Sequence, residues 1–191
     1  MTVCSVQEII LANPGRSALF VIMQSSLVMT VLGEDRPGLV RNLADVVAAH
    51  GGNWLESRMS RLAGQFAGIV RIECPADSID ALTTALQDRT ASGLTILAVR
   101  EDAILEVTRR MVIVDVMGAD RPGIVREFAS VVAAAGGNIE ELTTGLDSAP
   151  MSGHPMFRAH GQISIPEDTE TEILVAAIES LGGDLTVDVS I

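Results

Sequence analysis

Residues 33–41 read Gly-Glu-Asp-Arg-Pro-Gly-Leu-Val-Arg, and residues 118–126 read Gly-Ala-Asp-Arg-Pro-Gly-Ile-Val-Arg. The repetition extends beyond this motif: residues 31–57 and 116–142 are identical at 17 of 27 positions when aligned at an offset of 85. A period of this length is too long for the unit of a solenoid and suits a complete small domain. The sequence therefore predicts two homologous domains in tandem.

Each copy of the motif joins a short apolar segment to an amphipathic one. Residues 27–32 precede the first copy, and apolar residues recur at helical spacing after it. The motif is thus predicted to connect a strand to a helix, with Pro37 at the first helical position, where its missing N–H costs nothing. Gly51-Gly52 is predicted to end this helix, because glycine takes the left-handed conformation readily.

The rest of each repeat predicts a βαββαβ order, with a hairpin turn at Ala63-Gly64 in the first copy. Further strands are predicted at residues 54–62, 65–74, 94–99, 110–117 and 185–191, and further helices after Pro75 and at residues 122–135 and 170–181. This order predicts an α+β fold of two ferredoxin-like domains, in which each antiparallel four-stranded sheet carries two helices on one face.

The domain boundaries follow from the repeat. We expect an N-terminal extension over residues 1–24, a first domain over 25–101, a linker over 102–109 and a second domain over 110–191. The second repeat has about six extra residues between its middle strands, which predicts a long loop within residues 147–156. Apolar residues occur on both faces of the strand at 111–117, which predicts that the far face of the second sheet is covered as well.

Composition limits the classes of function. A hydrophobic content of 48% with 20% charged residues is typical of a folded globular chain, and the net charge of −12 disfavours direct binding to nucleic acid. Cys4 and Cys74 form neither a disulfide framework nor a metal-binding pattern, which favours the cytoplasm. We expect no membrane span, cofactor or metal, and we find no catalytic motif.

The two helix entrances are the candidate binding sites. Unpaired N–H groups of a first helical turn favour a carboxylate, and Asp35 just upstream could hold an ammonium group or cap the turn. Together these groups would bind both ends of a zwitterion such as a free amino acid. The alternative is that the motif only starts a helix, with Asp35 as its cap and Arg36 solvated.

Two Asp-Arg-Pro-Gly turns, each followed by Gly-Gly-Asn after a helix, resemble the ACT domain, a small regulatory fold. With Ser-Gly-His-Pro-Met-Phe at 152–157, the chain is similar to the glycine cleavage system transcriptional repressor family. ACT domains frequently carry asparagine where this chain has Asp35 and Asp120, so the ligand remains open. The resemblance implies two ligand sites, lined by Asp35, Gly38, Leu39 and Asn53 and by Asp120, Gly123, Ile124 and Asn138.

The resemblance further implies a cytoplasmic, non-catalytic regulator. Its effector would be a small amino acid, with glycine or serine as the leading guesses, bound where ACT domains meet in a homo-oligomer such as a dimer. The signal would pass to a protein partner such as a transcription factor, in control of amino-acid metabolism or of its genes. Two alternatives stay open: a purely structural interaction module without a ligand, and a regulatory part of an enzyme.

Overall fold

A computed structural model describes residues 5–8, 21–89, 93–101, 108–148, 154–181 and 185–190. The chain divides into two compact units, Met1–Leu105 and Glu106–Ile191. Most of the predicted linker and the middle of the predicted long loop lie outside the described residues. No helix in the described ranges is long and apolar enough to cross a bilayer.

Both units have the predicted order of elements. The first unit contains β2 (Val21–Glu34), α1 (Leu39–Ala49), β3 (Asn53–Leu62), β4 (Gln65–Pro75), the short 3-10 helix η1 (Ala76–Ser78), α2 (Ile79–Gln87) and β5 (Leu94–Arg100). The second contains β6 (Arg109–Ala119), α3 (Ile124–Ala134), β7 (Asn138–Ser148), β8 (Pro155–Pro166), α4 (Thr171–Glu179) and β9 (Thr186–Ser190).

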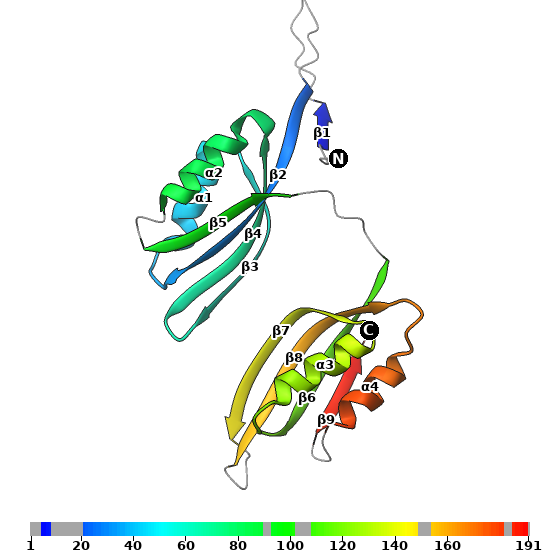
Figure 1. Ribbon diagram of the computed structural model, residues 1–191. Helices are drawn as coiled ribbons and strands as arrows, with labels where there is room; N and C mark the ends of the chain where they lie inside the picture. Colours follow the sequence, from blue (N-terminus) through cyan, green and yellow to red (C-terminus); the bar gives the residue numbers. More distant parts are fainter. Residues whose placement is uncertain are drawn as a thin grey trace, which may run out of the picture. The chain divides into compact units, whose positions relative to one another are not determined.

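The sheets have equivalent topologies. Their strand orders are β5-β2-β4-β3 and β9-β6-β8-β7, with every neighbouring pair antiparallel. The two helices of each unit cover one face of its sheet (Figure 1). The predicted fold class, two βαββαβ domains in tandem, is confirmed.

The first sheet has one additional strand. β1 (Ser5–Glu8) pairs with the first residues of β2, and Gln24 of β2 pairs with Ser5 on one side and with Pro75 on the other. β1 therefore follows β5 along the same edge of β2. Part of the predicted N-terminal extension thus belongs to the sheet.

Alternation along the strands separates a buried inner face from an outer face. In β2 the inner face presents Leu27, Met29 and Val31, which pack in one core with α1 and α2; in β6 the equivalent residues are Val112, Val114 and Val116, which pack with α3 and α4. The two helices of the second unit do not cover the far face of its sheet, and the prediction that this face is covered stays a prediction. Met111, Ile113 and Met117 are exposed, because both helices lie on the opposite face.

α1 and α3 each begin two residues later than predicted. Pro37 is not the first residue of α1: it lies in a turn over Arg36–Leu39, in which the Leu39 N–H donates to the Arg36 carbonyl at 3.4 Å. Gly38 has φ 88° and ψ 1°, the values of the third residue of a type II turn. Proline is favoured at the second position of that turn, so it fixes the approach to the helix and not its first turn.

The predicted helix end is confirmed. Gly51 has φ 69°, its N–H donates to the Ala48 carbonyl, and the Gly52 N–H donates to the Val47 carbonyl. These bonds make a Schellman motif, which satisfies the last carbonyls of α1. Gly136 and Gly137 repeat this arrangement after α3. The Gly-Gly part of each Gly-Gly-Asn triplet is therefore explained by helix termination.

Candidate functional site

The entrance to α1 is open. Gly38 is exposed, no side chain caps the helix, and the first turn contains no acidic residue. Arg36 lies to one side, where it donates to Glu34 at 2.6 Å. The N–H groups that follow Leu39 at this end carry the positive end of the helix dipole, so the entrance can accept an anionic group from outside the unit.

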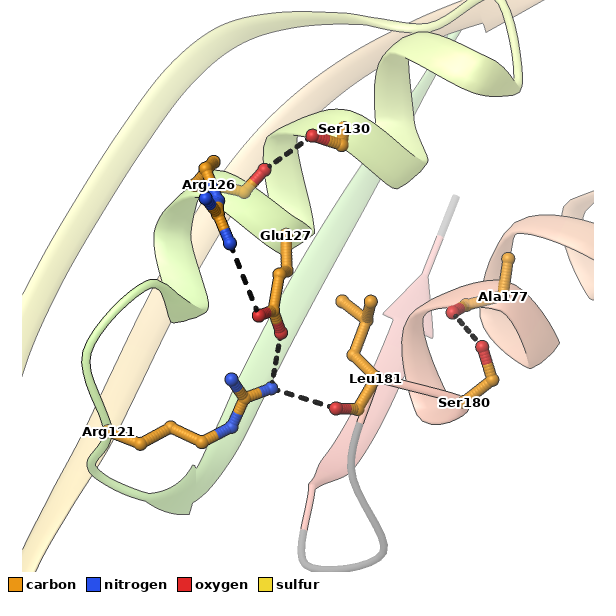
Figure 2. A network of polar contacts seen from close by, with 7 residues as sticks. All are labelled: Arg121, Arg126, Glu127, Ser130, Ala177, Ser180 and Leu181. Atoms are coloured by element: carbon orange, nitrogen blue, oxygen red, sulfur yellow. Dashed lines mark hydrogen bonds and ion pairs between the residues drawn. The ribbon is translucent and has the colours of Figure 1, made fainter.

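The entrance to α3 has the same backbone and also lacks a side-chain cap, but it carries an acidic residue. Gly123 has φ 92° and ψ −3°, but the first turn of α3 contains Glu127. Figure 2 shows Arg121 reaching from the turn to the Glu127 carboxylate at 2.5 Å, with Arg126 3.9 Å from its other oxygen. The same Arg121 nitrogen donates to the Leu181 carbonyl at 2.8 Å, which ties the start of α3 to the end of α4.

Electrostatics keeps this internal pair charged. The hydrogen bond to Arg121 holds the pKa of Glu127 below its ordinary value, and the bond to Glu127 raises the pKa of Arg121. A carboxylate is therefore already present at the second entrance. At the first entrance the equivalent residue is Asn42, which has no charge.

The two aspartates of the motif also differ. Asp35 makes an ion pair with Arg61 of β3 at 2.6 Å, and its N–H donates to the Gly64 carbonyl. The N–H of Asp120 makes the equivalent bond to the Pro155 carbonyl, but the position of Arg61 is taken by Leu146 in the second unit. An ammonium group would therefore compete with Arg61 at Asp35 and would not meet that competitor at Asp120.

Asn53 and Asn138 lie away from the entrances. Each begins an edge strand directly after the glycine pair that ends the preceding helix, and Asn138 donates to Glu140 at 2.9 Å. Gly38 lies at the other end of α1, which has 11 residues and is therefore roughly 16 Å long. A single unit thus brings Asp35, Gly38 and Leu39 together, as it does Asp120, Gly123 and Ile124, and leaves each asparagine at the far end of its helix.

A shallow hollow lies beside the second asparagine. It is lined by small and apolar residues of α3 and the start of β7, namely Ala129, Val132, Ala133, Gly137, Asn138 and Ile139. In the first unit Trp54 stands at the position of Ile139 and packs against the core. Ile139, the smaller of the two equivalent residues, packs against the core of the second unit.

Sequence reasoning missed the side chains that distinguish the two entrances, Arg61 and the Arg121–Glu127 pair. One available signal was the difference between Asn42 and Glu127 at equivalent positions of otherwise matching helices. Within the described ranges, no three His, Cys, Asp or Glu side chains are grouped so as to hold a metal. Cys74 is buried in the first core, and burial raises the pKa of its thiol, which makes it a poor nucleophile.

Comparison with known proteins gives the class. Residues 25–97 match the ACT domain family. The first unit therefore contains an ACT domain, and the second, which repeats its topology, is ACT-like. Over most of its length the chain resembles the glycine cleavage system transcriptional repressor of Escherichia coli, with 28% identity over 173 residues, which are 88% of this chain and 90% of the repressor.

Other relatives differ in how much of their length matches this chain. A phosphoserine phosphatase of Mycobacterium tuberculosis is 28% identical over 174 residues, but the chain spans only 40% of its length. A crystal structure of an unknown protein from Galdieria sulphuraria is 29% identical, with a TM-score of 0.77 and coverage of 87% of this chain and 98% of that one. A protein provisionally assigned as a glycine cleavage system transcriptional repressor has the same coverages, 19% identity and a TM-score of 0.64, which shows the fold alone.

Proposed function

We propose that this chain is a cytoplasmic, non-catalytic regulator that binds a small amino acid at an ACT interface and transmits its presence to a protein partner. The observation that carries the proposal is the open entrance of α1, where helix N–H groups face outward without a capping side chain or an acidic residue in the first turn. The names of the relatives favour glycine or serine, because one concerns glycine cleavage and another phosphoserine.

The geometry favours an effector bound between two ACT domains. Gly38 and Asn53 belong to opposite ends of α1, so the two can line one ligand only if each comes from a different domain. If the edge strand of a neighbouring domain ran antiparallel to β3, the asparagine at the start of that strand would lie near this entrance. The proposed site residues are therefore Asp35, Gly38 and Leu39 from one domain and an asparagine, Asn53 or Asn138, from another. Asp120, Gly123 and Ile124 form the second copy, beside the Glu127 carboxylate.

The proposed mechanism is a population shift. An amino acid that binds only one arrangement of domains at 100 times its Kd stabilises that arrangement by about 2.7 kcal/mol. The arrangement so favoured would present a different surface to the partner, such as a transcription factor. Direct contact with DNA is disfavoured by the net charge of −12.

A thermal-shift screen with the twenty amino acids tests this function. Glycine or serine is expected to raise the melting temperature of the wild-type chain, and the increase should be smaller in Asp35→Ala because Asp35 is proposed to hold the ammonium group. Asp45→Ala is the matched control, since Asp45 lies on the exposed side of α1 and pairs only with Arg41 among the described contacts. The absence of a shift with all twenty amino acids would leave the structural interaction module as the better reading.

A second function is favoured by one observation. The phosphatase of Mycobacterium tuberculosis matches this chain over only 40% of its own length, so a region similar to this chain is part of an enzyme. The chain would then regulate a catalytic subunit instead of a transcription factor. Isolation of the native complex and identification of its subunits distinguish these partners.

A further inference from the structure

A chain of side-chain hydrogen bonds leads from the first residue of β6 to Asn138. Arg109 donates from Nε to the Ser164 hydroxyl at 2.9 Å, and this hydroxyl donates to Oε1 of Glu140 at 2.6 Å. Asn138 donates from Nδ2 to the same Glu140 oxygen at 2.9 Å. Ser164 is 3% exposed and is the only buried polar residue in the part of the chain that the structure describes. The network therefore connects a buried hydroxyl to an exposed asparagine.

The chemistry of these groups fixes the direction of each bond. A guanidinium group can only donate, and an ionised carboxylate can only accept. Because Arg109 donates to Ser164, the hydroxyl of Ser164 is left to donate to Glu140. The carboxylate of Glu140 likewise requires Asn138 to turn its NH2 group inward, so the amide oxygen Oδ1 is directed away from Glu140. Asn138 thus presents a hydrogen-bond acceptor to its surroundings.

A β-bulge places the Glu140 carboxylate in this network. The pairing of β7 with β8 shifts between Ile139 and Glu141, so Glu140 is the extra residue of the bulge. A bulge re-aims the side chain of the strand that carries it. The carboxylate consequently reaches a residue of its own strand, Asn138, and a residue of the neighbouring strand, Ser164.

The first unit has the same bulge and a different residue in it. The extra residue of β3 is Leu55, and a hydrocarbon side chain cannot accept a hydrogen bond from Asn53. Glu73 pairs with Asn53 where Ser164 pairs with Asn138, so the hydroxyl is replaced as well. The carboxylate that orients the asparagine of the second unit therefore has no equivalent at the same position of the first.

The hollow beside Asn138 leaves room for a small molecule. Its volume is about 180 Å³, below the roughly 300 Å³ at which pockets for drug-sized ligands begin. Small residues line it, among them Ala129 and Ala133 of α3 and Gly137 before β7. The space next to the amide therefore suits a molecule no larger than a small amino acid.

We propose, on the basis of the proposed function, that Asn138 and not Asn53 is the asparagine of the amino-acid site, and that Glu140 is the residue that positions it. An ammonium group has three N–H donors and no acceptor. It binds the oxygen that Asn138 presents, and its other donors allow Asp35 of the α1 entrance to share it. A carboxylate at the same place would meet the negative charge of Glu140. Asn138 thus receives the ammonium end of the amino acid.

Isothermal titration calorimetry of the full chain tests this assignment, with glycine and serine as probes. Asn138→Ala is expected to raise the Kd about tenfold, as for the loss of a hydrogen bond to a charged group. Asn53→Ala, the matched control, should bind like the wild type. Glu140→Leu introduces the residue of the first unit and should raise the Kd about three- to tenfold, because the amide is then free to turn. Glu140→Gln removes the same charge, keeps an oxygen acceptor and should restore most of the affinity.

Two further measurements separate positioning from a general structural role. Acetate carries the carboxylate of glycine without the ammonium group, so its effect on the melting temperature should be the same in Glu140→Leu and in the wild type. By NMR spectroscopy without ligand, the side-chain amide protons of Asn138 should exchange with water more slowly than those of Asn53, and Glu140→Leu should abolish the difference. Circular dichroism verifies folding of this variant, whose leucine the first unit accommodates in the same bulge.

The results distinguish this assignment from the proposed function. If glycine or serine binds and the affinity falls in Asn53→Ala but not in Asn138→Ala, the assignment is overturned and the proposed function stands. Equal exchange rates for the two asparagine amides in the wild type overturn the positioning role of Glu140. A wild type that binds none of the twenty amino acids overturns the proposed function, and the assignment with it.

Discussion

The two units place different residues on equivalent surfaces. The strand register is the same in both sheets, including an irregularity at the same position of β3 and β7. One outer row nevertheless reads Ile69, Thr30 and Leu97 in the first sheet and His160, Asp115 and Asp188 in the second. The buried inner faces are apolar in both. The inner face therefore specifies the fold, whereas the residues of the outer face can differ between the units.

The helix entrances differ in the same way. Gly38 and Gly123 have nearly identical backbone angles. At the second entrance, however, α3 itself provides the Glu127 carboxylate, which Arg121 holds by a hydrogen bond. The first has Asn42 at that position. Neither helix has a side-chain cap, so the two entrances share a backbone and differ in whether a carboxylate of the helix itself lies beside it.

The largest expected effect is a loss of stability when a glycine that ends a helix is replaced, and both units share this feature. Gly52→Ala and Gly137→Ala each place a Cβ within 3.0 Å of the valine carbonyl that accepts the helix-ending hydrogen bond. Each is expected to destabilise its own unit by about 1–3 kcal/mol, because the glycine pair must move away from the helix. Fluorescence of Trp54, the only tryptophan, reports urea unfolding of the first unit, and circular dichroism reports both.

Equal losses in the two variants would support the equivalence of the units. The comparison would be broken if Gly137→Ala lowered the unfolding midpoint recorded by Trp54 as much as Gly52→Ala does. That result would show that the units unfold as one cooperative body.

Exchange of one residue sharpens the difference between the entrances. Asn42→Glu gives α1 the acidic residue of α3, and it is expected to abolish the stabilisation by glycine or serine, about 2.7 kcal/mol at 100 times the Kd, because two carboxylates would repel each other. Glu127→Asn should retain the ligand response of the first unit. Isothermal titration calorimetry would measure both; a ligand that binds Asn42→Glu and wild type equally would place the site elsewhere.

The smallest expected effect is a decrease in the stability of the folded state at acidic pH. The pKa of Glu127 is lowered by its bond to Arg121. Burial alone would raise the pKa of Glu101, but the hydrogen bonds from Ser26 and Arg71 and the charge of Arg71 together lower it. A carboxylate with a lowered pKa stabilises the folded state fully above its ordinary value of 4.5, and this stabilisation is lost as pH falls through the folded value.

Urea unfolding below and above pH 4.5 measures this loss. Both transitions should move to lower urea in acid. In Glu127→Gln the second transition should depend less on pH than in the wild type, while the Trp54 transition should be unchanged. A second transition with the same pH dependence in variant and wild type would mean that the Arg121–Glu127 pair contributes nothing measurable.

The fold was largely predictable because its signals are local and occur twice. The apolar spacing of each helix, the alternation along β9 and the glycine pairs after α1 and α3 all depend on residues close in sequence. Pro37 was misplaced because proline suits both the first turn of a helix and the second position of a type II turn. The conformation of Gly38, and not the proline, distinguishes the two.

The sequence by itself determined the duplication, the class of fold and the position of the two entrances. Only the tertiary structure decided how those entrances differ, because Asp35 meets Arg61 across a strand and Arg121 reaches the Leu181 carbonyl 60 residues away. It also decided that both helices leave one face of each sheet uncovered. Contacts of this range depend on side chains brought together by the whole sheet, and no local periodicity encodes them.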